Sequence, residues 1–457
     1  MKHSRCHLPF ALTLSLVTGC TVVNSIDVCE RGREEERPLN ARNDGDQYVL
    51  GANSIATLPS GSALVVFTSN DGPGDMEVRW RVVGADGVPR ATCEAETEYT
   101  YEPPAGAPVP GTRFGPVIAG PRSEGDLGLV AFIATDAADP DEGRQLWAQA
   151  INTAPCPEDE PFLVRDPGGG AIGSTAIVGL TNEKFVVIWQ ELEPATLTSG
   201  GAVMARVLRA RALGVEVLPT VPSADGAAVS ISVEDRVVAS PAAVAIGDLE
   251  LAVAWLGIGP DELRVWLAVL DDRLVARVPP RVVARQPRGV TAFGPRLGLA
   301  TDGAAILVVW SVDAGDGGQA YGLPADVDGN PTGDPIALGA GESNVENAPV
   351  AVGLPGGGYL VAWESLGNLR HEDQDRYGIR AMALGSDGTP RFTNPACGAG
   401  ELQMNRITED DQVRPALARL RDGSVLSAWS DFSPKLNPVD SGIVLRLFRP
   451  RDLLPLE

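Results

Sequence analysis

The stretch PGGGYLVAWESL, residues 355–366, joins a glycine turn to an apolar strand that ends on a tryptophan, and the chain repeats this unit. A short strand precedes each turn, and an aromatic residue ends each apolar strand. The seven copies end at Phe67, Phe132, Trp189, Trp255, Trp310, Trp363 and Trp429. These aromatic residues recur about every 60 residues. Self-similarity at a steady period predicts a repeat architecture.

The repeating unit carries the signals of four antiparallel strands. Pairs such as Asp302-Gly303 and Asp422-Gly423 mark the turn of the first hairpin. An alternating third strand, such as MEVRWRVV at 76–83, follows a polar loop, and a less regular fourth strand comes after it. Four-stranded units around a ring predict an all-β protein, a seven-bladed β-propeller. Tandem immunoglobulin-like sandwiches need longer units of about 100 residues. An eighth, degenerate blade remains an alternative.

Two further features bear on how the ring is built. The terminal aromatic residues are expected to pack between blades rather than to form a ligand cage. Five copies place a proline at the expected start of their first strand, where a backbone donor is dispensable: Pro116, Pro241, Pro295, Pro349 and Pro415. The last copy stops after its third strand, so we predict that residues 47–50 supply the missing strand and close the ring.

The first twenty residues have the pattern of an export leader. Lys2 and Arg5 precede an apolar run, LPFALTLSLV at 8–17, which is too short to span a bilayer. The run leads into VTGC at 17–20, which resembles the lipobox of bacterial lipoproteins. An ordinary cleaved secretion signal is the alternative.

The resemblance to lipoproteins implies a processed and anchored chain. Residues 1–19 would be removed as a signal peptide, and Cys20 would carry the lipid that binds the membrane. Thr21, in the position after the lipid, favours the outer membrane, on its periplasmic face or at the cell surface. Residues 20–46 are polar and predict a tether, so the propeller is expected over 47–457.

The other cysteines of the exported chain predict disulfides. Cys29, Cys93, Cys156 and Cys397 are even in number and form no CxxC pair. Three of them follow the third strands of their units, and Cys29 lies upstream of the expected closing strand. Neighbouring places in the ring favour Cys29 with Cys397 and Cys93 with Cys156, among three possible pairings.

The chain is strongly acidic, with a net charge of −23 that falls to −25 without the leader. Such a surface repels phosphate backbones and excludes nucleic acid as a partner. It favours cations or basic proteins instead, or it serves only to keep the protein soluble.

Acidic residues also recur within the repeat. In six copies an acid follows the terminal aromatic residue within four positions, where loops should share one face of the ring. These acids are Asp71, Asp136, Glu191, Asp313, Glu364 and Asp431, and Asp139, Asp141 and Asp316 lie close to them in sequence. Acids that alternate with glycine suit Ca²⁺, so an acidic rim that binds Ca²⁺ or a basic partner is predicted, with solvated turns as the alternative.

Catalytic motifs are scarce. Beyond the leader the chain has one histidine, His371, so metal sites built from several histidines are excluded, and no serine elbow supports a Ser-His-Asp triad. We therefore expect a lipid-anchored envelope module that binds or scaffolds an envelope protein or glycan. The alternative is a polysaccharide hydrolase or lyase that uses carboxylates. An acid pair in a central pocket would favour the enzyme, and a flat acidic face would favour binding.

Overall fold

The computed structural model describes most of the chain from residue 35 to residue 450. The described ranges are 35–39, 46–49, 51–70, 76–90, 99–100, 110–122, 127–136, 144–151, 161–165, 171–181, 183–192, 201–211, 214–220, 226–232, 238–287, 296–313, 318–339, 345–366, 376–391, 401–434 and 441–450. Within these ranges no helix is long and apolar enough to cross a membrane.

The strands form seven antiparallel sheets. Blades one to three contain β2 (Asp46–Tyr48), β3 (Ile55–Thr57), β4 (Ala63–Asn70), β5 (Met76–Val83) and β6 (Tyr99–Thr100); β7 (Pro110–Ala119), β8 (Gly128–Asp136), β9 (Arg144–Ile151) and β10 (Phe162–Arg165); and β11 (Ala171–Gly179), β12 (Lys184–Leu192), β13 (Ala202–Arg211), β14 (Gly214–Val217) and β15 (Val229–Ser230). Blades four and five contain β16 (Val238–Ala245), β17 (Glu250–Ile258), β18 (Glu262–Asp271) and β19 (Ala276–Pro287), and β20 (Leu297–Thr301), β21 (Ala305–Asp313), β22 (Gly318–Asp326) and β23 (Ile336–Leu338). Blades six and seven contain β24 (Val345–Gly353), β25 (Tyr359–Leu366), β26 (Tyr377–Leu384) and β27 (Leu402–Gln403), and β28 (Gln412–Arg419), β29 (Val425–Asp431), β30 (Gly442–Phe448) and β1 (Arg37–Pro38).

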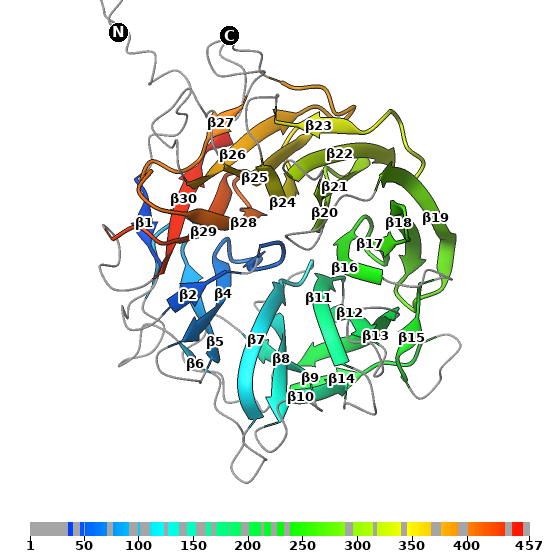
Figure 1. Cartoon of the computed structure of the whole chain (residues 1–457). Coiled ribbons are helices and arrows are strands. Elements are labelled where there is room, and N and C mark those ends of the chain that lie inside the picture. Colours follow the sequence, from blue (N-terminus) through cyan, green and yellow to red (C-terminus); the bar gives the residue numbers. More distant parts are fainter. Residues whose placement is uncertain are drawn as a thin grey trace, which may run out of the picture.

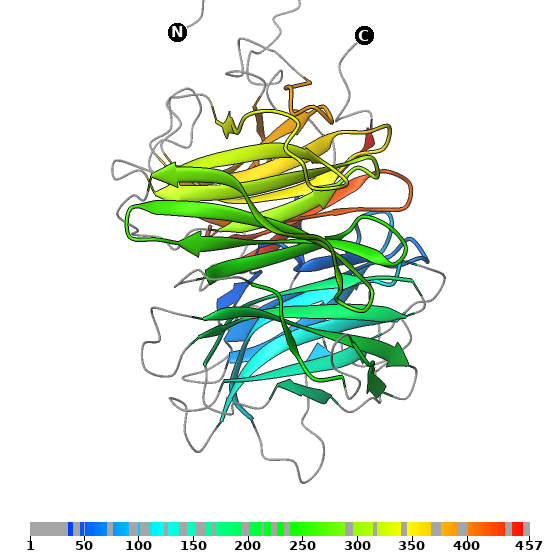
Figure 2. The ribbon, with the colours of Figure 1, turned by 90° about the vertical axis from the view of Figure 1, so that its right-hand side faces the viewer.

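The seven sheets stand around one central axis and confirm the predicted seven-bladed propeller (Figure 1). The first strand of each blade lies nearest the axis, and the blade grows outward by successive hairpins. Seen from the side, the sheets stack one beside the next around the ring (Figure 2). PGGGYLVAWESL is the turn and second strand of blade six, and Trp363 lies opposite Arg380 of the third strand.

The terminal aromatic residues form the core between blades, as predicted. All seven are at most 1% exposed. Phe132 of blade two packs with Val66 of blade one, and Trp363 of blade six packs with Val309 of blade five. A blade is apolar on both faces, so it buries them only when a neighbour stands on each side.

The ring is closed by β1, at the N-terminal end of the described chain. β1 pairs antiparallel with β30, with Arg37 opposite Leu445, and completes the seventh blade. Leu39 follows it, is fully buried, and donates its backbone N–H to the Ile443 carbonyl at 2.8 Å. Residues 37–39 therefore belong to the propeller, although the sequence pattern assigned them to the tether.

The prediction that residues 47–50 supply the missing strand of blade seven is wrong. β2 pairs with β4 of the first blade, where Gln47 lies opposite Ser69. The Gln47 N–H also donates to the Ser441 carbonyl of blade seven at 3.3 Å. The segment thus crosses from the last blade to the first, and the fourth strand of blade seven lies earlier in the chain.

At one end of the central channel the inner strands approach each other too closely for side chains. A Cβ atom at Gly120 would lie 2.2 Å from the Thr57 carbonyl oxygen of blade one. A Cβ atom at Gly179 would lie 2.0 Å from the Gly120 carbonyl oxygen. Gly353 would meet the Thr301 carbonyl oxygen, also at 2.0 Å. These glycines set the spacing of neighbouring blades, because any side chain would push the blades apart.

Candidate active site in the axial pocket

A pocket of about 540 Å³ opens on the axis, at the face where the second strands end. Ligand sites commonly have volumes of roughly 300–1,000 Å³. Six of the seven blades contribute to its wall, so the site requires the closed ring. We call it the axial pocket; its polar and aromatic lining consists of Asn53, Ser174, Thr175, Ser240, Arg296, Asn347, Glu364, Tyr377, Asp411, Arg414 and Phe432. A second cavity of about 290 Å³ shares four lining residues with it and extends along the inner strands.

A repeated irregularity in the inner strands shapes the axial pocket. The pairing register shifts near the start of the inner strand in blades two, three, four, six and seven. Five blades have a residue with positive φ there: Asn53 (65°), Gly115 (68°), Ser240 (48°), Ala348 (44°) and Arg414 (58°). Positive φ is uncommon for residues other than glycine and gathers at functional sites, and bulges re-aim side chains.

The prolines of the repeat belong to these bulges. Pro116, Pro241, Pro349 and Pro415 each follow a residue with positive φ and lie inside their strands, not at the first residue as predicted. A bulge breaks the ladder of hydrogen bonds, so the missing donor of proline is tolerated there. Pro295 lies outside the described residues.

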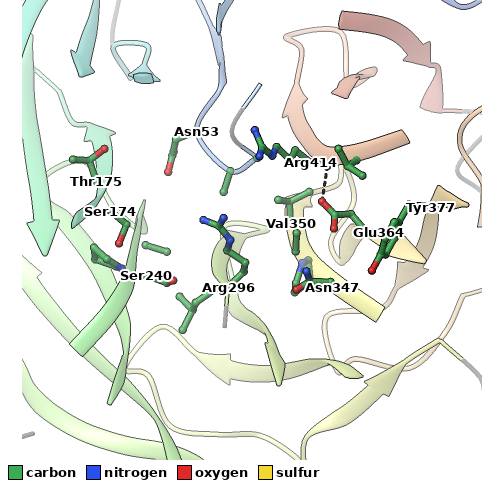
Figure 3. A pocket seen from close by; sticks show the side chains of 18 of the residues that line it. Asn53, Ser174, Thr175, Ser240, Arg296, Asn347, Val350, Glu364, Tyr377 and Arg414 are labelled. Atoms are coloured by element: carbon green, nitrogen blue, oxygen red, sulfur yellow. Dashed lines mark hydrogen bonds between the residues drawn. The ribbon is translucent and has the colours of Figure 1, made fainter. Parts of the chain in front are cut away.

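Two arginines point into the axial pocket, and neither has an acidic partner within 4 Å among the described residues (Figure 3). Arg296 precedes β20, and two hydrogen bonds with Ser311, at 3.0 and 3.3 Å, hold its backbone. The Arg414 guanidinium lies 5.2 Å from the centre of the Tyr48 ring. Burial and the like charge of Arg296 lower the pKa of Arg414. The pocket thus holds two positive charges that form no ion pair within 4 Å among the described residues, with the carboxyl of Glu364 in the same pocket.

Glu364 is the buried carboxyl of the axial pocket, with 7% of its surface exposed. Its Oε1 accepts the backbone N–H of Arg414 at 2.7 Å, across the boundary between blades six and seven. Burial raises the pKa of Glu364, and the nearby Asp411 adds to this, while Arg414 and Arg296 oppose it. A carboxyl with a raised pKa in a pocket is a candidate for proton transfer.

Tyr377 and Asp411 lie beside Glu364. The Tyr377 backbone N–H donates to Asp411 Oδ1 at 3.0 Å. Asp411 Oδ2 also lies 3.8 Å from a guanidinium nitrogen of Arg376. Burial, and then the negative charges of Glu364 and Asp411, raise the pKa of the Tyr377 hydroxyl. The phenol therefore keeps its proton.

The rest of the wall combines neutral hydrogen-bonding groups with apolar residues, among them Phe432. Asn347 lies opposite Glu364 across strands β24 and β25, and its Oδ1 accepts the Ser311 hydroxyl at 3.0 Å. Asn53 donates to the Ile177 carbonyl at 3.3 Å. Phe432 leaves 40% of its surface exposed. Such a wall suits a ligand with several hydroxyl groups and at least one anionic group.

The structure separates the predicted acidic residues. Glu364 lies in the axial pocket, Glu191 pairs with Arg165 at 2.7 Å, and Asp431 is fully buried, with Oδ1 accepting the Ser433 N–H at 2.7 Å. Of the three, Glu364 and Asp431 are therefore buried and Glu191 is held in an ion pair, and the acidic rim stays a prediction. Asp136 and Asp313 end β8 and β21, and Asp71, Asp139, Asp141 and Asp316 lie outside the described residues. Among the side chains that the structure describes, no three acidic, histidine or cysteine groups gather as a metal site would need.

The other predicted sites cannot be placed. Cys20, with its predicted lipid, and Cys29, Cys93, Cys156 and Cys397, with their predicted disulfides, all lie outside the described residues. They stay predictions.

Sequence reasoning missed both arginines. Aligned on the narrow end of the channel, the inner strands place Arg296 and Arg414 in one position, where the other blades have Ala52, Gly115, Ser174, Ser240 and Ala348. Two arginines at a position that is small in the other five blades would have indicated a functional site. This comparison requires the register of the inner strands, which the sequence alone does not give.

Comparison with known proteins finds distant matches among solved structures. No protein-family model and no curated protein matches the chain. Among solved structures, a protein of unknown function from Dyadobacter fermentans is 14% identical with a TM-score of 0.45, and the match covers 91% of this chain and 99% of that one. A polysaccharide lyase is 9% identical with a TM-score of 0.48, covering 88% and 90%. An α-L-arabinanase from Penicillium chrysogenum, solved with arabinobiose, is 11% identical with a TM-score of 0.46, covering 76% and 97%. Matches this distant carry no argument about ligand or activity.

Proposed function

We propose that the axial pocket binds an acidic saccharide, with Arg296 and Arg414 holding its carboxylate. The observation that carries this proposal is the pair of guanidinium groups without an ion-pair partner among the described residues, inside a protein of net charge −23. Guanidinium groups bind carboxylates through paired, charge-assisted hydrogen bonds. The amides and hydroxyls of the wall match the hydroxyl groups of a sugar ring.

The charge of the axial pocket argues against a cationic ligand. The net charge of the chain favoured cations or basic partners, but net charge describes the outer surface and long-range steering. A ligand in the pocket meets the two guanidinium groups at short range, where the dielectric constant is lower and their interaction is stronger. An anion is therefore the favoured ligand of this site.

Arg414→Asn and Arg296→Gln should each weaken the binding of oligouronates by about 10- to 100-fold, because each removes a charged hydrogen-bond donor worth roughly 1.5–3 kcal/mol. Asparagine suits position 414, since it tolerates the positive φ of 58° better than most residues. Isothermal titration with galacturonate, mannuronate and glucuronate oligomers measures the affinities.

Arg285→Gln is the matched control for charge. Arg285 lies on the outer strand β19, is exposed and pairs with Glu262 at 2.6 Å, so its loss should leave the affinity unchanged. The binding proposal fails if no oligouronate binds, or if the two pocket variants bind as tightly as the control. Equal binding of neutral oligosaccharides would also contradict it.

We also propose that the propeller works as a binding module at the cell envelope, held by a lipid on Cys20. The support is the leader followed by VTGC at 17–20. In bacteria that lipidate such chains, the wild-type protein should incorporate labelled palmitate and sediment with membranes.

Cys20→Ser should abolish palmitate labelling, because the serine hydroxyl does not form the thioether. Cys29→Ser is the control and should keep the label. A wild-type chain that is exported, cut and unlabelled would show an ordinary secretion signal and refute the lipid anchor.

A further inference from the structure

The axial pocket holds proton-transfer groups beside its anion-binding groups. From this arrangement we propose that the protein cleaves its acidic saccharide by β-elimination, with Glu364 as the general base and Tyr377 as the general acid. The inference rests on the proposed function, because the carboxylate of the ligand must first be held by Arg296 and Arg414. The sequence left a polysaccharide hydrolase and a polysaccharide lyase as alternatives, and this proposal selects the lyase.

The available carboxyl groups decide between hydrolysis and elimination. Hydrolysis of a glycosidic bond commonly uses two carboxyl groups, one as acid and one as base or nucleophile. Asp411 is engaged by the Tyr377 N–H and lies close to Arg376. Glu364 uses only Oε1, for the Arg414 N–H, and its Oε2 has no hydrogen-bond partner among the described residues. One available carboxyl and one phenol fit an elimination better than a hydrolysis.

The arginines and the proton-transfer groups reach the axial pocket from different blades. Arg296 and Arg414 come from blades five and seven, and Glu364 and Tyr377 come from blade six (Figure 3). A sugar whose carboxylate lies on the guanidinium groups can present its ring to blade six, which also lines the axial pocket. The carbon that bears the carboxylate is then the ring atom next to the anion site.

The reaction balances without another reactant. Glu364 takes the proton from the ring carbon that bears the carboxylate, and the C–H electron pair forms a double bond to the neighbouring carbon. The bond from that carbon to the glycosidic oxygen breaks, and the oxygen receives the Tyr377 hydroxyl proton. The products are a sugar with a new carbon–carbon double bond and a chain with a free hydroxyl. Proton transfer from Glu364 to the Tyr377 phenolate through solvent restores the site.

The surroundings of each group suit its role. The guanidinium groups stabilise the negative charge that builds up on the carboxylate when the proton leaves, which lowers the barrier. Burial raises the pKa of Glu364 toward the range in which a general base is effective. Burial and negative neighbours also raise the pKa of Tyr377, so it enters the reaction as an acid.

Arg414 links the two halves of the site. Its side chain lines the anion site, while its backbone N–H holds Oε1 of Glu364 at 2.7 Å. Arg414 has a positive φ of 58° and lies at the bulge of its strand. The same residue therefore positions the base relative to the bound carboxylate.

The test combines binding and turnover on the full chain. Polygalacturonate, polymannuronate and a glucuronic acid polymer are titrated against Glu364→Gln, which binds without cleaving. Polymers that bind are then given to the wild type, and the ultraviolet absorbance of the new double bond is followed. We expect Glu364→Gln and Tyr377→Phe to lower kcat by roughly 10²- to 10⁴-fold with little change in KM.

Controls separate a chemical role from a structural one. Glu262→Gln removes a partly exposed carboxyl of blade four, away from the axial pocket, and should keep full turnover. Thermal melting shows whether each pocket variant folds. The acid limb of the kcat/KM profile should lie above the ordinary glutamate pKa of about 4.3, because Glu364 must be ionised to act.

The outcomes are distinct. Binding without any double bond in the wild type overturns the elimination and leaves the proposed binding function intact. New reducing ends without a double bond indicate hydrolysis and also overturn it. Full turnover by folded Glu364→Gln removes the assigned base. If none of the polymers binds, the proposed function fails first and the elimination falls with it.

Discussion

A chain that lacks residues 1–40 should melt about 5–10 °C below a chain that lacks residues 1–33. The longer deletion removes β1, whose pairing with β30 completes blade seven. It also removes the buried side chain of Leu39, worth roughly 2–5 kcal/mol. Glu36 is lost as well, and its carboxyl accepts the backbone N–H groups of Arg406 and Ile407. The total is of the order of 5 kcal/mol, and each kcal/mol shifts Tm by slightly more than about 1 °C in a protein of this size.

The shorter deletion is the matched control, because it removes the leader and most of the tether but keeps Glu36 to Leu39. Differential scanning calorimetry of both chains measures the difference. Equal melting temperatures would show that β1 does not hold the ring closed. The Leu39→Asp variant tests the same contact without a deletion, and it should also melt early because it buries an unpaired charge.

Gly179→Ala should lower the free energy of unfolding by about 3 kcal/mol. The added Cβ would lie 2.0 Å from the Gly120 carbonyl oxygen and 3.0 Å from its carbon. The obstacle is the backbone of the neighbouring blade, so no rotamer change relieves the contact. Overpacking of this kind costs roughly 1–3 kcal/mol, and a rigid obstacle places the variant at the upper end.

Gly333→Ala is the control for glycine replacement. It has ordinary φ and no atom within 4 Å of an added Cβ, so its effect should stay within about 0.5 kcal/mol. Urea unfolding of both variants gives the comparison. If Gly179→Ala were as stable as the control, the spacing of the blades would have to be set by other contacts.

The blade repeat was predictable because its apolar strands and terminal aromatic residues recur along the sequence at a regular spacing. Trp363 and its six counterparts recur at nearly constant intervals, and a strand that buries both faces reads as an apolar run. The closing strand was not predictable, because β1 has only two residues and shows no periodicity. Leu39 reveals its role only through contacts with a strand about 400 residues later in the chain.

The axial pocket was only partly within reach of the sequence. Glu364 was singled out by its place after a terminal aromatic residue, and the structure puts it in the pocket. The burial of Glu364 could not be predicted from the sequence, because the exposure of a residue at the end of a strand depends on contacts with the neighbouring blade. Arg296 and Arg414 were hidden for another reason: they lie 118 positions apart and meet only because the ring brings blades five and seven to one axis.

The position of β1 would also limit how far a lipid-anchored propeller reaches from a membrane. A lipid on Cys20 would be joined to Glu36 by sixteen residues, which span at most about 55 Å when fully extended. This tether would join the propeller at blade seven, the blade that carries Arg414. Its short length would confine the protein to polymers in a thin layer next to the bilayer, so encounters would depend on which glycans lie at that depth and little on their concentration in the bulk fluid.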